Sequence, residues 1–199
     1  MTTHKIALLA GDGIGPEIIA EAVKVLKLIE ERNGVSFDLQ PALFGACAWF
    51  ETGKSFPDDT IAICDNADAI LKGTIGLSHE ESKQIPVDEQ PERGGLLPMR
   101  RRYQTYANFR PVTLPPELAH FSPLRPEIIG EGIDLVIIRE LVGGLYFGSK
   151  ETGVNDQGRR YVHEMLEYDE DQIRQVLEVA FKLAMKRKKS LTNVHKSNV

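Results

Sequence analysis

The first third of the chain alternates between short apolar runs and longer segments whose apolar residues recur with a helical period. Residues 5–10 are, after the lysine, an unbroken apolar run, which predicts a strand buried on both faces. A helix is predicted from about Pro16 to Glu31, because a proline opens it and an apolar stripe follows. Further elements are expected at 35–39 (strand), 58–66 (helix) and 67–71 (strand). This alternation predicts an α/β fold with a largely parallel sheet.

Residues 78–95 break this pattern, because they are polar and rich in proline, glycine and glutamate. They predict an exposed excursion from the first domain. A helix is expected at 96–105, with Pro98 in its first turn. The first domain is therefore expected to span residues 1–105 and the second residues 106–199.

The second half combines strands with one long helix. Strands are expected at 106–112 and 134–139, joined by a proline-rich connector at 113–126. Residues 146–161 carry turn residues and predict a projecting hairpin, followed by a strand through Tyr168.

A helix is predicted from about Asp169 to Lys188, since Asp169 and Gln172 form a capping-box pattern at its start. A last strand is expected at 191–199. The helix is expected to bury one apolar face, made of Ile173, Val176, Leu177, Ala180, Phe181 and Ala184.

Composition excludes several classes of function. A net charge of -5 argues against nucleic acid as the partner, and an apolar content of 42% permits a buried core. Cys47 and Cys64 are too few and too far apart for a zinc site or a disulfide framework, so a reducing, cytoplasmic location is expected. The N-terminal apolar run ends at Gly11, too early for a membrane span, and no membrane partner is expected.

Two kinds of residue suggest a ligand site. The glycines of residues 11–17 (GDGIGPE) lie between a strand and a helix, where backbone can approach a ligand and the helix N-terminus favours anions. Their spacing is not that of a Rossmann motif, so a tight turn and a cofactor contact both remain open. Arg110 and Arg139 end apolar strands, where a carboxylate ligand or a structural ion pair would account for their charge.

The chain resembles the isopropylmalate/isocitrate dehydrogenase family over essentially its whole length. Five motifs carry the resemblance in the family's order: GDGIGPE (11–17), YANFRPV (106–112), SPLRPE (122–127), RELVGGLYFG (139–148) and VHKSNV (194–199). The resemblance implies an isopropylmalate dehydrogenase-like α/β fold, with parallel and mixed sheets in two domains around a cleft. It assigns the first domain to the cofactor side and the second to substrate binding and dimerisation.

The family's site residues carry over onto this sequence one by one. Arg100, Arg110 and Arg139 look like the arginines that grip the substrate carboxylates. Tyr146 looks like the catalytic tyrosine. Lys196 looks like the catalytic lysine, which in this family reaches into the other subunit, so a homodimer is implied.

The resemblance also implies cofactors. Ile14 matches a residue near the adenine of NAD, and Thr74 lies where the family lines the nicotinamide side. Mg²⁺ or Mn²⁺ is implied as well, but the family's metal-binding aspartates fall beyond the position of Val199. We therefore expect an incomplete C-terminal end, and an inactive truncated chain remains an alternative.

The substrate implied is a 2-hydroxy dicarboxylic acid that is oxidised and decarboxylated. Leu96 and Leu97, ahead of Arg100, offer an apolar pocket that suits the isopropyl group of 3-isopropylmalate, whereas a third carboxylate there would be costly to bury. Two departures keep tartrate-, malate- and isocitrate-type substrates open. Glu92 lies one residue further from the leucines than usual, and KGTIGLSH (72–79) replaces a commoner glycine-rich pattern.

Overall fold

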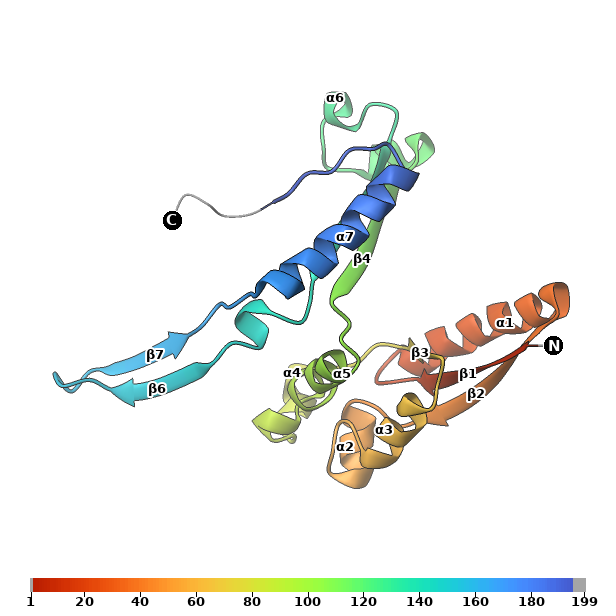
Figure 1. The fold of residues 1–199 in the computed structure, drawn as a ribbon. Helices are drawn as coiled ribbons and strands as arrows, with labels where there is room; N and C mark the ends of the chain where they lie inside the picture. Colours follow the sequence, from red (N-terminus) through yellow and green to blue (C-terminus); the bar gives the residue numbers. More distant parts are fainter. Residues whose placement is uncertain (1, 195–199) are drawn as a thin grey trace. The chain divides into compact units, whose positions relative to one another are not determined.

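A computed structural model describes residues 2–194 of the chain, which divide into two compact units between Arg102 and Tyr103 (Figure 1). The first unit contains a parallel sheet and the second contains antiparallel strand pairs. The prediction of a mixed α/β fold is therefore confirmed. None of the helices in residues 2–194 is long and apolar enough to cross a membrane.

The first unit is built on a three-stranded parallel sheet in the order β2-β1-β3. The side chains of Ile6 and Leu9 on the central strand are buried, as the apolar run predicts. The predicted long helix is confirmed with a left-handed Gly34 at its C-terminal end. The elements are β1 (Thr2–Leu9), α1 (Gly15–Asn33), β2 (Val35–Ala42), α2 (Ala46–Thr52), α3 (Asp58–Asp65) and β3 (Ala69–Lys72).

Helix α2 has no counterpart among the predicted elements, and its N-terminus is capped from a distance. The carboxylate of Asp12, which is 5% exposed, accepts hydrogen bonds from the backbone N–H groups of Ala46 (2.9 Å) and Cys47 (2.8 Å). It also accepts the N–H of Gly76 at 2.9 Å. An acidic group at a helix N-terminus satisfies orphan amides and complements the helix dipole. One carboxylate therefore joins the first βα turn, α2 and the segment after β3.

The expectation of an exposed excursion at 78–95 is wrong for part of the segment. Ser78 and Glu81 form a capping box that starts a short helix, and the side chain of Ile85 is 3% exposed. Burial of this apolar side chain draws the segment onto the unit. The elements here are α4 (His79–Ser82), a 3₁₀ turn (Val87–Glu89), a π-helical turn (Pro91–Leu96) and α5 (Leu97–Arg102).

The second unit pairs β4 with β5 and β6 with β7, both antiparallel. Helix α7 lies along the β4–β5 pair, and the capping box between Asp169 and Gln172 is confirmed (Figure 1). The elements are β4 (Ala107–Leu114), a 3₁₀ turn (Pro116–Phe121), α6 (Pro126–Ile129), β5 (Ile133–Glu140), a 3₁₀ turn (Gly144–Tyr146), β6 (Lys150–Val154), β7 (Arg160–Glu164) and α7 (Glu170–Lys186).

The apolar face predicted for α7 is only partly buried. Ala180 is 7% exposed, but Ile173 and Phe181 are 46% and 58% exposed. In β5, Val136 and Ile138 are half-buried whereas Leu135 and Ile137 are exposed, so α7 covers one face of this strand.

Two predicted strands are wrong. The strand expected through Tyr168 ends at Glu164, because the following backbone bonds to the turn before β6: Met165 donates to the Ser149 carbonyl and Glu167 accepts from Gly144. Residues 191–194 form no strand, since a strand needs a hydrogen-bonding neighbour and none pairs with them in the described part of the chain. The remainder of that expected strand, 195–199, lies outside the described residues.

Replacing Asp12 with alanine should destabilise the complete protein strongly. Three amides would lose a buried acceptor, and each unsatisfied group costs about 1–3 kcal/mol, so a loss of about 3 kcal/mol or more is expected. Urea unfolding measures this loss. Asp12→Asn keeps one acceptor oxygen and should lose less; an equal loss in both variants, or none in either, would contradict the role given to the carboxylate.

Candidate active site

The loop between β1 and α1 is a tight turn held against the residues after β3. Gly11 has a φ of 77°, and a β-carbon there would overlap the Thr74 carbonyl. The Asp12 N–H donates to that carbonyl at 2.8 Å, and the Thr74 hydroxyl donates to the Asp12 carbonyl at 3.0 Å. The tight-turn interpretation of this motif is thus confirmed, and the glycine is explained without a ligand.

The same contacts bring together the two residues expected to bind the cofactor. Ile14 follows Asp12 by two positions and is 58% exposed, and Thr74 is exposed on the segment bonded to Asp12. Ile14 also precedes the N-terminus of α1, where no side chain caps the first turn. An exposed apolar side chain at a helix N-terminus fits part of a dinucleotide, so the residues present are compatible with NAD. Their cofactor role stays a prediction.

Lys72 is a candidate site residue that the sequence did not reveal. It is the last residue of β3, its side chain is half-buried, and its Nζ donates to the Gly73 carbonyl at 2.6 Å. Burial lowers the pKa of Lys72, the positive charge of Arg100 lowers it further, and Asp12 opposes both effects. Two cations therefore lie near the carboxyl edge of a parallel sheet, where such folds bind ligands. The only signal in the sequence was the unusual KGTIGLSH segment.

The predicted substrate residues of the first unit lie on one turn of helix. Leu97 and Arg100 are three positions apart in α5 and so share a face, with Leu96 directly before them. Leu96, Leu97 and Arg100 are half-buried, whereas Met99 is buried and anchors the other side. The first unit thus combines positive charge with apolar surface on this turn.

The second unit places two predicted arginines on one face of the β4–β5 pair. Asn108 lies directly opposite Arg139 in the antiparallel register, and Arg110 lies two residues further along β4. Side chains two positions apart point to the same side of a strand, so Arg110 and Arg139 are diagonal neighbours, roughly 7–8 Å apart at the backbone. Arg110 Nε donates to the Asn108 side chain at 2.6 Å, which orients the guanidinium on this face.

Tyr146 lies beside this arginine pair. The guanidinium carbon of Arg139 is 5.4 Å from the centre of the Tyr146 ring, and Tyr146 is 57% exposed. The turn that carries it is fixed by Glu140, whose carboxylate accepts the N–H groups of Val142 (2.6 Å) and Gly143 (3.1 Å). The acid that ends β5 therefore shapes the tyrosine turn.

The predicted set is divided between the two units. The first unit contains Ile14, Thr74, Leu96, Leu97 and Arg100, whereas the second contains Arg110, Arg139 and Tyr146. Lys196 lies outside the described residues.

The metal expected from the resemblance does not fit the residues that are present. Within residues 2–194, no group of three or more His, Cys, Asp or Glu side chains could hold a metal ion. A hard divalent cation needs several oxygen ligands, usually including carboxylates. The expectation that its ligands lie beyond Val199 stays a prediction.

Comparisons with known proteins agree with one another. The family described as isocitrate/isopropylmalate dehydrogenase matches residues 5–199. A 3-isopropylmalate dehydrogenase of Carboxydothermus hydrogenoformans is 46% identical over 98% of the chain and 51% of its own length. One of Haemophilus influenzae is 41% identical over 100% of the chain and 55% of its own length. The chain thus spans about half the length of the curated relatives it matches.

Solved structures show the same similarity. An isocitrate dehydrogenase from Methylococcus capsulatus superposes with a TM-score of 0.70 at 25% identity, covering 92% of this chain and 48% of that one. The TT0538 protein of Thermus thermophilus gives 0.65 at 27% identity, covering 91% of this chain and 32% of that one. Sequence and structure together show that the chain belongs to the isocitrate/isopropylmalate dehydrogenase family.

Proposed function

We propose that the complete protein containing this chain converts 3-isopropylmalate to 4-methyl-2-oxopentanoate, as a step of leucine biosynthesis. NAD is the oxidant, and the other products are carbon dioxide and NADH. The observation that carries this proposal is the turn on which Leu96 and Leu97 precede Arg100. The relatives named 3-isopropylmalate dehydrogenase support it.

Substrate binding follows from the chemistry of these side chains. Arginine guanidinium groups bind carboxylates through paired hydrogen bonds. Arg110 and Arg139 share one face of the second unit, and Arg100 lies in the first unit. The half-buried leucines meet the isopropyl group and disfavour a charged substituent, which would lose its hydration there. A 2-hydroxy dicarboxylic acid with a branched side chain satisfies both requirements.

The chain's own residues account for the proton transfers. NAD, when bound, accepts the hydride from the carbon that carries the hydroxyl. Lys196, directly or through water, assists loss of the hydroxyl proton, and Tyr146 donates a proton to the enol left after carbon dioxide departs. Arg139, over the Tyr146 ring, holds the phenol beside the carboxylate-binding face. Because the described residues supply no metal ligands, no step is assigned to Mg²⁺ or Mn²⁺ here.

The assembly proposed is a homodimer, because the resemblance has Lys196 reach the partner's site. A second candidate substrate is isocitrate. The observation that favours it is Lys72, since an additional cation beside Arg100 would suit a third carboxylate.

A substrate panel tests the function. The complete gene product, assayed with NAD and added Mg²⁺ or Mn²⁺, should show a kcat/KM for 3-isopropylmalate at least about tenfold above those for D-malate, tartrate and isocitrate, since a filled apolar pocket gives discrimination of this order. A preference for isocitrate would instead support the second candidate. Equal rates with tartrate would contradict the role of the leucines.

Replacing Tyr146 with phenylalanine should lower kcat by about 100-fold or more, the usual contribution of a general acid. KM should change little, because the ring that Arg139 contacts is retained. Steady-state kinetics of the complete protein separate the two parameters. Tyr161→Phe, which removes a hydroxyl bonded to Glu151 on the β6–β7 hairpin, is the control and should retain turnover. A loss confined to KM would show that Tyr146 binds substrate instead.

Replacing Lys72 with methionine should raise the thermal midpoint at neutral pH. The pKa of Lys72 is lowered in the folded state, so the unfolded chain holds its proton more tightly and the buried charge destabilises the fold. The loss of folding stability caused by charged Lys72 is complete at pH values below its pKa in the folded state. It disappears as the pH rises towards 10.5, the ordinary pKa of lysine. The difference between variant and wild type should therefore shrink at alkaline pH.

The same variant tests the site. Isopropylmalate should protect wild type against thermal unfolding more than it protects Lys72→Met, because the variant has lost a cation near Arg100. Lys83→Met removes an exposed lysine paired with Glu80 and is the matched control, with neither effect expected. Equal protection of wild type and Lys72→Met would show that Lys72 does not take part in substrate binding.

A further inference from the structure

The turn that carries Tyr146 is rich in glycine. Gly143 and Gly144 come just before the tyrosine, and Gly148 comes two residues after it. Gly144 has a φ of 70°, in the left-handed region. Glycine backbone can adopt many conformations, so such a turn keeps one geometry only when groups outside it hold it. Because Tyr146 itself is 57% exposed, packing around its own ring contributes little to its position.

The segment between β7 and α7 bonds to this turn through its backbone. The Gly144 N–H donates to the Glu167 carbonyl at 2.8 Å. The Met165 N–H donates to the Ser149 carbonyl at 2.9 Å. A β-carbon at Gly148 would overlap the Met165 carbonyl oxygen, so this close approach requires glycine. The segment is therefore held against the turn both before and after the tyrosine.

The side chain of Tyr168, in the same segment, covers the glycine pair. A β-carbon on Gly143 would lie 2.8 Å from Cδ1 of the Tyr168 ring. One on Gly144 would lie 2.8 Å from Cζ of that ring and would overlap its hydroxyl oxygen. The ring therefore occupies the space that side chains would take on two consecutive residues of the turn.

Helix α7 fixes the point from which this ring projects. Tyr168 directly precedes Asp169, the N-cap of α7, whose carboxylate accepts the Gln172 N–H at 2.7 Å. The helix packs on β5, which ends at Glu140, and the Glu140 carboxylate accepts the Gly143 N–H. The glycine turn is therefore held by a carboxylate from β5 and by an aromatic ring from the start of α7.

We propose that Tyr168 is a positioning residue, whose ring keeps the glycine turn in the geometry that holds the Tyr146 phenol beside the face of Arg110 and Arg139. A proton donor must lie within hydrogen-bond reach of the atom that it protonates, and a displacement of about 1 Å can cost up to about 100-fold in rate. Without the ring, the glycines gain other conformations, and the phenol is correctly placed in fewer molecules. This inference rests on the proposed function, because it concerns the proton donor of that reaction.

The test is a double-mutant cycle in the complete gene product, with kcat and KM measured on the substrate that wild type prefers in the panel. Tyr168→Leu should lower kcat about tenfold and change KM less than about twofold. Tyr168→Phe keeps the ring and should retain kcat. In a Tyr146→Phe background, Tyr168→Leu should cause no further loss, because Tyr168 acts only through the Tyr146 hydroxyl.

Hydrogen–deuterium exchange gives a second measurement, which needs no substrate. The bond to the Glu167 carbonyl protects the Gly144 amide, so a peptide spanning 141–149 should exchange faster in Tyr168→Leu than in wild type. Tyr168→Phe should exchange at the wild-type rate. Unchanged exchange in Tyr168→Leu would overturn the proposal.

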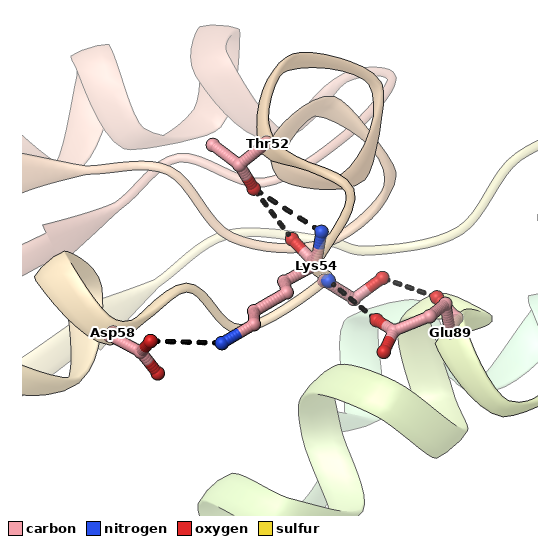
Figure 2. Close-up of polar contacts among 5 residues, drawn as sticks. Thr52, Lys54, Asp58 and Glu89 are labelled. Atoms are coloured by element: carbon pink, nitrogen blue, oxygen red, sulfur yellow. Dashed lines mark hydrogen bonds and ion pairs between the residues drawn. The ribbon is translucent and has the colours of Figure 1, made fainter.

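Thr52→Val is the control for a general loss of stability. Its hydroxyl, in the first unit, donates to the Ala48 carbonyl at 2.8 Å and accepts the Lys54 N–H at 3.3 Å. Figure 2 shows Thr52 beside the Lys54 backbone. The variant should lower the thermal midpoint but retain kcat and the exchange rate of the tyrosine turn. An equal loss of kcat in Thr52→Val and Tyr168→Leu would overturn the positioning role.

The possible failures are distinguishable. If wild type turns over isopropylmalate but Tyr168→Leu lowers kcat equally with and without the Tyr146 hydroxyl, the positioning role is overturned and the proposed function stands. If wild type prefers another 2-hydroxy acid, the proposed function is overturned, and the cycle on that acid still decides the role of Tyr168. Wild type without activity on any substrate of the panel would overturn both.

Discussion

One buried carboxylate constrains the whole first unit. Asp12 accepts N–H groups from the start of α2 and from the residues after β3, while its own backbone bonds to Thr74. Because these partners lie 34 to 64 positions away in the chain, the loops at the carboxyl edge of the sheet cannot move separately. The residues expected to meet the cofactor, Ile14 and Thr74, take their positions from this one interaction.

Local patterns predicted the elements whose stability is local. Helices α1 and α7 and strands β1 to β5 follow from apolar runs and periodicity, and the capping box of α7 lies within four consecutive residues. Helix α2 and the turns at 79–96 were not predicted, because the residues that cap or anchor them are distant in the sequence. Asp12 caps α2, and Ser55 anchors the turn after Glu89. A sequence read in short windows contains no trace of such partners.

The site was predictable to the same extent. Charge on apolar strands singled out Arg110 and Arg139, and the antiparallel register places them on one face. The expectation that Arg110 ends its strand is wrong, because β4 continues to Leu114 and Arg110 lies in its middle. Tyr146 was identified only through the family resemblance, because its contact with Arg139 depends on a turn that Glu140 holds. Lys72 was missed because a lysine ending a short strand is usually a surface residue, and only its burial next to Arg100 distinguishes it.

The electrostatics of the first unit make a charged Lys72 costly for the fold. Asp12 is the acid whose charge opposes the lowered pKa of Lys72, but its two oxygens already accept three backbone amides. The Asp12 carboxylate therefore attracts Lys72, but its amide partners keep it from rotating towards the lysine. The fold therefore maintains a half-buried lysine within the field of Arg100 at a cost in stability.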